Sequence, residues 1–397
     1  MQMKKEKWLV YCWGSINEPQ FCSTLMRMGM EYVTYNRKMN DYHADAGFAE
    51  DFLHFLHSSR CGVVFSYDYY PMLSMICSIN RIPYISWIYD CPQYTIFSET
   101  ICSPYNFVFC FDRAFTDRIR KLGAQHCYHL PLAPGYHMEE SIWDNAAMQQ
   151  KYASEVSFVG SLYQQNPMAA ISDYSRGFLE GLLQAQETVY GYNFLREVLD
   201  AEEHRKIVNE LVAAEKLCLG KGYRRDDVQM VADYLGKRIT ARERAEGIKL
   251  LAREHTVDLY TSSTFPEDFR SLPVRNRGYA DAQQQVPFIY HYSKVNLNIT
   301  LKTIETGIPQ RVLDILSCGG FCISNYQTEL AEYMEDGKDM VMYVSMEDLA
   351  DKVSYYLVHE EERQIIAQNG YEKVCRRFAL ENRIQEMVCR ISETLSL

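Results

Sequence analysis

A short segment in the last third of the sequence combines a turn, a helix start and two residues of opposite charge. The segment "NITLKTIETGIPQRVLDILSCGGF" (298–321) predicts a strand end, a loop with Gly307 and Pro309, and a helix that stops at a double glycine. Backbone N–H groups at a helix start are unpaired, and the helix dipole attracts an anion there. Arg311 adds a positive fork for phosphate oxygens, and Asp314 can accept hydrogen bonds from ribose hydroxyls. The segment therefore suggests a site for a nucleotide.

The same two charged residues also allow a purely structural interpretation. Arg311 and Asp314 are three residues apart, which is the spacing of an ion pair on the surface of a helix. In the preceding strand "KVNLNIT" (294–300), apolar residues alternate with a polar row that includes Asn298. Such a row must be satisfied internally or meet a ligand if both faces of the sheet are covered. On these residues alone, a nucleotide site and a capped helix with an exposed ion pair remain equally open.

Length and composition indicate a globular protein with more than one domain. The chain has 397 residues, which predicts two or three domains, and it is 47% hydrophobic and 23% charged. Its net charge of −11 argues against a nucleic-acid partner. No apolar run is long enough for a membrane span or a signal peptide, and the thirteen scattered cysteines fit reduced thiols. We therefore expect a cytoplasmic protein without an integral membrane segment.

Apolar strands alternate with helices in the first third of the chain. Continuous apolar strands indicate a parallel sheet that is covered on both faces. Three of these strands end on an acid, at Asp68, Asp90 and Asp112. Because the carboxyl ends of parallel strands face the ligand crevice, some of these acids are expected to line it, although aspartate also caps helices. The strands are expected at residues 7–14, 61–68, 82–90, 105–112 and 126–134.

The rest of the chain predicts a second α/β domain. A polar linker is expected from Gly135, and a new strand and turn begin in "VSFVGSLY" (156–163). A charged helical insertion follows, after which strands and helices alternate again. The expected domains are 1–148 and 154–375, with the helical insertion at about 169–254 and a last helix at 376–397 that can cross back to the first domain.

Several stretches of the sequence resemble one known family. The region from Ser293 to Leu357, with "PVRNRGYAD" upstream, is similar to the C-terminal half of bacterial CgeB-like glycosyltransferases, which are named after a spore-maturation protein. "SWIYDCP", "FCFDR" and "LPLAP" resemble the N-terminal half of that family, and "SFVGSLY" resembles the start of its second domain. The resemblance covers most of the chain except the helical insertion. It implies an α/β fold of GT-B architecture, in which two Rossmann-like domains face each other across a cleft and the C-terminal domain holds a nucleotide-sugar donor.

The resemblance also bears on the segment that carries Arg311. The wider retaining branch has two glutamates, separated by seven residues, on this loop and helix. In this chain Asp314 occupies the second position and Thr306 the first, with Glu305 one residue before it. The diphosphate is expected at the helix start, the ribose at Asp314, and the base near the "VRNRG" segment. The predicted donor-binding residues are Gly160, Ser161, Arg275, Asn276, Asn298, Thr306, Gly307, Ile308, Arg311 and Asp314.

The implied reaction is sugar transfer without a metal ion or a cofactor. The sequence has no DxD pair to hold a metal on the diphosphate, and the helix start with Arg311 can take its place electrostatically. In a retaining reaction, which the resemblance favours, the leaving diphosphate can act as base, whereas an inverting reaction needs a carboxylate from the N-terminal domain. Asp90 and Glu305 are the candidate catalytic residues. We expect a hexosyl- or related transferase of class EC 2.4 with a UDP-sugar as co-substrate. Its acceptor can be a glycan, a protein or a small molecule.

Two further function classes remain open from the sequence. A GT-B enzyme with another reaction, such as a sugar-nucleotide epimerase or a phosphorylase, would need more acid and base groups around the sugar. A non-catalytic protein that binds a nucleotide-sugar is supported by Thr306 at the first glutamate position.

Overall fold

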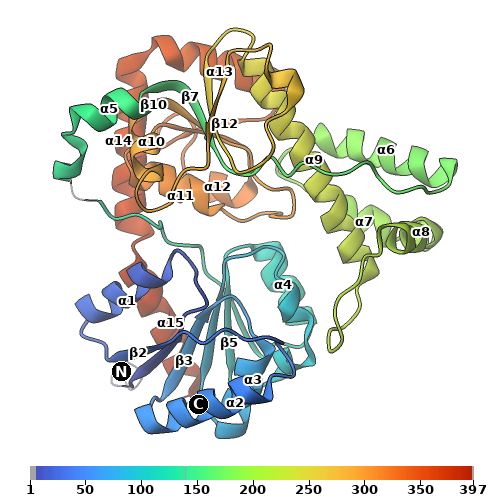
Figure 1. The fold of residues 1–397 in the computed structure, drawn as a ribbon, viewed down its shortest axis with the longest axis vertical. Helices are drawn as coiled ribbons and strands as arrows, with labels where there is room; N and C mark the ends of the chain where they lie inside the picture. Colours follow the sequence, from blue (N-terminus) through green and yellow to red (C-terminus); the bar gives the residue numbers. More distant parts are fainter. Residues whose placement is uncertain (1–5, 139, 396–397) are drawn as a thin grey trace. The chain divides into compact units, whose positions relative to one another are not determined.

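The computed structural model describes residues 6–138 and 140–395 and consists of two compact units (Figure 1). The first unit contains the chain up to Gly135, residues 219–225, and the chain from Phe378 onward. The second unit contains residues 136–218 and 226–377. Each unit is built on a six-stranded sheet.

The first unit is a parallel α/β domain. Its sheet has the strand order β2-β1-β3-β4-β5-β6, and every neighbouring pair is parallel. Strands β1, β3, β4 and β5 are buried along their whole length, as expected for a sheet covered on both faces. The elements are β1 (Trp8–Tyr11), α1 (Glu18–Arg27), β2 (Tyr32–Tyr35), α2 (Ala46–Ser59), β3 (Val63–Tyr67), α3 (Pro71–Asn80), β4 (Tyr84–Ile88), the short 3-10 helices η2 (Tyr94–Phe97) and η3 (Glu99–Cys102), β5 (Asn106–Cys110), α4 (Arg113–Lys121), β6 (His126–His129) and α15 (Leu380–Leu395).

Local sequence explains where helices of the first unit begin and how they pack. Asp112 accepts a hydrogen bond from the backbone N–H of Phe115 and so caps α4. Pro71 lies in the first turn of α3, where its missing N–H leaves no helical hydrogen bond unmade. Between α1 and the sheet, the rings of Phe21 and Phe65 stack with their centres 3.9 Å apart.

The second unit repeats the parallel α/β arrangement. Its strand order is β12-β11-β10-β7-β8-β9, again with parallel neighbours, so β10 and β7 occupy the centre. The elements are η4 (Glu140–Trp143), α5 (Ala146–Tyr152), β7 (Ser154–Val159), α6 (Asp173–Glu187), α7 (Leu195–Leu199), η5 (Glu202–His204), α8 (Arg205–Glu215), α9 (Asp227–Leu251), β8 (Val257–Tyr260), η6 (Glu267–Phe269), β9 (Val274–Gly278), α10 (Val286–Tyr292), β10 (Ser293–Asn298), α11 (Gln310–Ser317), β11 (Cys322–Asn325), α12 (Thr328–Tyr333), β12 (Val341–Tyr343), α13 (Met346–Val358) and α14 (Glu360–Arg377).

The helical insertion of the second unit has a hydrophobic core of its own. Leucines, isoleucines and valines of α6, α7, α8 and one half of α9 pack together, separately from the core around the sheet. Figure 1 shows α6, α7 and α8 to one side of the sheet, with the long helix α9 leading back to it. The far half of α9 joins the sheet core through Ile248 and Leu251. Helix α9 therefore links the small bundle rigidly to the sheet.

Two edge strands differ from the sequence-based expectation. Strand β2 was not predicted, and the segment that forms β9 was described only as a polar stretch. Both lie at the edge of their sheets, and their residues are largely half-buried or exposed. Because one side of an edge strand faces water, it lacks the continuous apolar run by which the inner strands were recognised.

The chain leaves the first unit at Gly135, earlier than the boundary near residue 148 that the sequence suggested, whereas the last helix returns to the first unit as expected. Residues expected to form a linker after Gly135 pack on the second unit, because the Trp143 ring contacts Phe288 and the Tyr292 hydroxyl donates to the Trp143 carbonyl at 2.7 Å. The last helix, α15, lies with the first unit, where Glu381 forms an ion pair with an arginine of α1.

A segment inside the helical insertion, residues 219–225, also lies with the first unit. The Tyr223 ring contacts the His43 ring edge-on with centres 4.5 Å apart, and the Arg224 N–H donates to the Phe97 carbonyl at 2.8 Å.

All thirteen cysteines are free thiols. Within residues 6–138 and 140–395, no group of three or more His, Cys, Asp and Glu side chains is arranged to hold a metal ion. None of the helices described there is both long enough and apolar enough to cross a bilayer.

Candidate functional site

The polar row of the central strand β10 is satisfied inside the protein. Asn298 is fully buried at the carboxyl end of this strand. Its side-chain amide donates to Ser324 Oγ at 2.8 Å, and its Oδ1 accepts from Arg311 Nη1 at 3.0 Å. Asn298, which was predicted to contact the donor, thus holds the guanidinium of Arg311 at the end of the strand.

The Arg311 guanidinium lies against the backbone of Gly160. Strand β7 ends at Val159, and Gly160 follows with a backbone φ of +151°. Residues other than glycine rarely adopt this angle. A Cβ atom at Gly160 would lie 2.5 Å from Nη2 of Arg311. The guanidinium carbon is also 5.4 Å from the centre of the Phe158 ring. A side chain at Gly160 would therefore displace the guanidinium of Arg311 from this position.

Arg311 does not form the exposed ion pair with Asp314 that the spacing allowed. Gln310 Nε2 donates instead to Asp314 Oδ1 at 2.8 Å, and Asp314 is only 7% exposed. Pro309 precedes the first residue of α11 and makes no side-chain cap. In the described part of the chain, no carboxylate lies within ion-pair distance of Arg311. A positive charge without an acidic partner thus stands in the first turn of a helix.

A second arginine, which the sequence analysis did not single out, lies beside Arg311. Arg244 of α9 is 2% exposed and donates from Nε and Nη2 to the Ile299 carbonyl, at 3.2 and 2.7 Å, and from Nη1 to the Ser161 carbonyl. Its guanidinium carbon is 5.3 Å from the centre of the Phe158 ring. Burial, followed by the positive charge of Arg311, lowers the pKa of Arg244 to about 9, so the guanidinium remains charged at neutral pH.

The loop before α11 is fastened to α12. Thr306 Oγ1 donates to Glu329 Oε1 at 2.6 Å, and the Thr306 carbonyl accepts from the Glu329 N–H at 3.1 Å. Gly307 and Ile308 are buried in the same loop. Glu305 is half-buried and lines a small cavity at the carboxyl ends of β10 and β11. A carboxylate, that of Glu329, is thus present beside Thr306, although Thr306 itself carries none.

Three other predicted donor residues have structural partners. Ser161 Oγ accepts from the N–H of Tyr163 at 3.0 Å and so shapes the turn after β7. Arg275 Nε pairs at 3.1 Å with the carboxylate of Asp258, which is fully buried. Asn276 is exposed, and its side chain accepts a backbone N–H two residues further along the chain. Ser161 directly follows Gly160 at the carboxyl end of β7, whereas Arg275 and Asn276 lie within β9.

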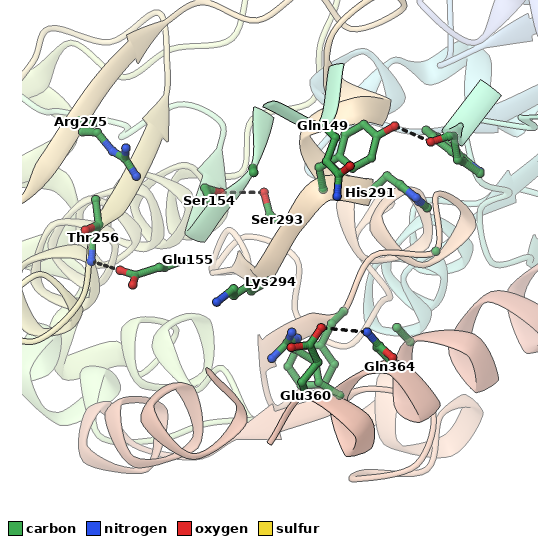
Figure 2. Close-up of a pocket in the computed structure, with 17 residues that line it drawn as sticks. Gln149, Ser154, Glu155, Thr256, Arg275, His291, Ser293, Lys294, Glu360 and Gln364 are labelled. Atoms are coloured by element: carbon green, nitrogen blue, oxygen red, sulfur yellow. Dashed lines mark hydrogen bonds between the residues drawn. The ribbon is translucent and has the colours of Figure 1, made fainter. Parts of the chain in front are cut away.

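Arg275 lines a cavity at the amino ends of strands in the second sheet, opposite to the carboxyl ends where Gly160 and Asn298 lie. This cavity has a volume of about 730 Å³ and opens where β7, β8 and β10 begin (Figure 2). Its wall carries charges of both signs, from Arg275 and Lys294 and from Glu155 and Glu360. Gly160 lies beyond the other end of the same strands. The structure thus does not bring Arg275 together with the residues around Arg311.

The three acids at strand ends of the first unit have different surroundings. Asp112 caps α4, as described above. Asp68 is 2% exposed, has a φ of +59°, and accepts at Oδ1 from the N–H groups of Tyr89 and Asp90, both at 3.0 Å. Asp90, the candidate base, is exposed and follows the carboxyl end of β4. Asp68 therefore fixes the backbone that carries Asp90.

Asp68 should make the stability of the first unit depend on pH. Burial, and then the charge of Asp90, raises the pKa of Asp68 to about 7, compared with about 3.9 for an unfolded aspartate. Because the pKa of Asp68 is higher in the folded state, the contribution of Asp68 to stability is largest below about pH 4 and is lost as pH rises through about 7. Asp68→Asn keeps an oxygen for the two N–H groups and should flatten this part of the curve of Tm against pH. Asp117→Asn, a change at an exposed acid, should leave the curve as it is, and an unchanged slope in Asp68→Asn would contradict the assignment.

Comparison with known proteins places these residues in a recognised fold. Residues 240–388, which include Arg244, β10 and α11, match the model of a family described as glycosyl transferase-like. No curated protein sequence matches the chain at a significant level.

Solved structures similar to the whole chain share its two-unit architecture. The Anabaena protein Alr3699/HepE in complex with UDP-glucose is 10% identical with a TM-score of 0.53, over 98% of this chain and 100% of that one. Sucrose-phosphate synthase from Thermosynechococcus elongatus is 11% identical with a TM-score of 0.53, over 99% of this chain and 100% of that one. At such low identity the likeness concerns the fold. The predicted α/β fold of GT-B architecture, with two Rossmann-like units, is thereby confirmed.

Proposed function

We propose that this protein is a glycosyltransferase that transfers a sugar from a nucleotide-sugar donor to an acceptor. The observation that carries the proposal is the position of Arg311. Its guanidinium lies at the start of α11 against the bare backbone of Gly160, without an acidic partner in the described part of the chain. A diphosphate at this point would meet a fixed positive fork and the positive end of the helix dipole together. The glycosyl transferase-like family match and the UDP-glucose complex of a protein with the same fold support this choice.

In this proposal the donor lies along the carboxyl ends of β7 and β10. The diphosphate contacts Gly307, Ile308 and Arg311, with Gly160 and Ser161 on the other side, and the ribose hydroxyls bind Asp314. The base lies beyond the end of β9, near Asn276. UDP is the first choice of nucleotide because it is bound in Alr3699/HepE. The class of acceptor is left open.

The proposed reaction does not require a covalent bond between the protein and the sugar. As the glycosidic bond breaks, negative charge grows on the leaving diphosphate, and Arg311 with the start of α11 stabilises that charge without a metal ion. We propose retention of configuration, because Asp314 occupies the second carboxylate position of the retaining branch that the sequence resembles. Glu305 is then the candidate carboxylate next to the sugar. Asp90 would serve as the base if the reaction inverts.

The experiment that tests the proposed function is a thermal-shift screen followed by a donor-hydrolysis assay. UDP, GDP, dTDP and their sugars are added singly at saturating excess, where a specific ligand stabilises by roughly a few kcal/mol. One nucleotide series should raise Tm, and the purified protein should slowly hydrolyse the matching sugar donor. Stabilisation by none of them would contradict the proposal. Binding without hydrolysis or transfer would favour a non-catalytic binding protein, for which Thr306 in place of a glutamate is the supporting observation.

Asp314→Asn should weaken donor binding more than it slows turnover. The change keeps the size of the side chain but removes a charged acceptor for the ribose hydroxyls. Loss of about 1.4 kcal/mol of ground-state binding would raise the donor KM about ten-fold with a smaller change in kcat. Glu335→Gln, which alters an exposed acid paired with Lys338, should leave both constants unchanged. An unaltered KM in Asp314→Asn would remove Asp314 from the donor site.

A further inference from the structure

Two guanidinium groups bridge the same two strand ends of the second unit. Arg311 connects Asn298, at the end of β10, with the backbone at Gly160, which follows β7. Arg244 connects the residues that come next in the chain, because it donates to the carbonyls of Ile299 and Ser161. Both guanidinium carbons lie over the same ring, that of Phe158, at 5.4 and 5.3 Å. One cation comes from α11 and one from the helical insertion, and they are near enough for the charge of Arg311 to lower the pKa of Arg244.

These two cations are not paired with carboxylates in the described part of the chain, although the charge of Glu243 acts on Arg244 at longer range. In residues 6–138 and 140–395, neither arginine forms an ion pair with an acid. The neighbouring acid, Glu243, is paired with Lys302, whose Nζ lies 3.0 Å from Glu243 Oε1. The hydrogen bonds of Arg244 and Arg311 go to neutral carbonyl and amide oxygens. Like charges held together in a partly buried place repel each other, and an anion would relieve that repulsion.

The turn beside Arg244 is itself strained. Tyr163 has a φ of +50°, which is unusual for a bulky residue and occurs mainly where the surrounding structure enforces it. Its ring lies 4.8 Å from the guanidinium carbon of Arg244. Arg244 is thus packed between two aromatic rings, Phe158 and Tyr163, and cannot swing away from Arg311 without disrupting both contacts. The charge pair is fixed by the fold.

We propose that Arg244 is a positioning and specificity residue of the donor site, through which the helical insertion makes binding depend on the charge of the phosphate chain. The inference rests on the proposed function and extends it. Because Arg244 is almost fully buried, it acts by holding the Ser161 turn and by adding its positive field to that of Arg311. The favoured ligands are nucleoside diphosphates and their sugar esters. Monophosphates, with less charge to place between the two cations, bind more weakly, and nucleosides bind weakest.

The test is an affinity series measured by isothermal titration with uridine, UMP and UDP. The guanosine or thymidine series replaces it if the thermal-shift screen selects that base. Arg244→Gln and Arg244→Met remove the charge, whereas Arg244→Lys keeps it. In both neutral variants the preference for the diphosphate over the monophosphate should fall about ten-fold, with nucleoside affinity nearly unchanged. In Arg244→Lys that preference should stay close to the wild-type value.

The matched control is Arg242→Met on the same helix. Arg242 is partly exposed and pairs with Glu180 and Glu187, so its loss should leave the whole series unchanged. If all Arg244 variants weaken the three ligands by the same factor, Arg244 has only a structural role and the inference is overturned.

A measurement on the wild-type protein covers the case in which no Arg244 variant folds. Screening by salt acts on charge, so the preference for the diphosphate should shrink as salt rises, and a preference independent of salt would overturn the inference. A wild-type protein that binds no nucleoside diphosphate would instead overturn the proposed function.

Discussion

Replacing Arg311 by alanine should reduce the turnover of the nucleotide-sugar donor about one-hundred-fold, with a smaller change in KM. In the proposed donor site the guanidinium stands where the leaving diphosphate gains negative charge, so its stabilisation should be greater in the transition state than in the bound donor. Removal of one fixed donor of this kind lowers kcat by about 10²–10³ in enzymes with comparable electrostatic stabilisation. The measurement is kcat and KM for donor hydrolysis, or for transfer once an acceptor is known.

Two further variants make this result interpretable. Arg311→Lys keeps the charge but loses the fork that reaches both Asn298 and Gly160, so its turnover should be intermediate. Lys294→Ala removes an exposed positive charge at the opposite edge of the same sheet, beside the cavity in Figure 2, and should have no effect. Equal activity of the wild type and Arg311→Ala would return α11 to the status of an ordinary packed helix.

Gly160→Ala should cost the protein most of its affinity for the donor. The new Cβ would lie 2.5 Å from Arg311 Nη2, and the backbone φ of +151° disfavours any side chain. The guanidinium must therefore leave its position, and we expect a loss of affinity of about ten-fold or more. Gly337→Ala is the matched control, because Gly337 also has a positive φ, +73°, but nothing lies within 4 Å of its would-be Cβ. That variant should lose some stability and keep its affinity for the donor.

A double-mutant cycle separates the clash with Arg311 from the backbone strain at Gly160. In an Arg311→Ala background the guanidinium is absent, so Gly160→Ala should cause little further loss of nucleotide affinity. The coupling between the two changes should then be close to the full effect of Gly160→Ala alone. Additive effects on affinity would show that the two residues act independently and would contradict the contact described here.

The sequence was sufficient to predict the inner strands of both sheets and one edge strand of each, β6 and β12, but not the other two edge strands, β2 and β9. Inner strands such as β3 and β4 are continuous apolar runs because helices cover them on both faces, and that pattern is visible in one sequence. Strands β2 and β9 are half-solvated, and their polar residues gave no such signal. In β9 the polarity has a structural reason, since Arg275 and Arg277 both pair with the buried Asp258.

Within the candidate site, most of the residues that the sequence singled out lie close together in the chain. The loop and helix from Gly307 to Asp314 carry their own sequence signals of a turn, a helix start and charge. Gly160 also stands out in the sequence, because it is a glycine directly after an apolar strand. Arg244 had no such signal, because the contact with Ile299 joins residues 55 positions apart and depends on how α9 passes the end of β10. A single sequence does not show which charged residue of a long helix turns inward.

The acids at the strand ends were easy to find in the sequence, but the sequence does not distinguish their roles. Asp68, Asp90 and Asp112 look alike in the sequence, because each ends an apolar strand. In the structure Asp112 caps a helix, Asp68 accepts two backbone N–H groups, and Asp90 is the exposed member of the three. Structural and functional uses of a strand-end acid differ only in the partners that the tertiary structure supplies.

The central claim is that the donor binds at the carboxyl-end edge of the second sheet, and a crystal structure with a bound nucleoside diphosphate tests it most directly. The nucleotide used is the one that stabilises the protein most in the thermal-shift screen. We predict phosphate oxygens within hydrogen-bond distance of Arg311 and of the backbone at Gly307 and Ile308, with the ribose hydroxyls at Asp314. A nucleotide bound only in the first unit, or only in the cavity at the amino ends of β7 and β10, would contradict the claim.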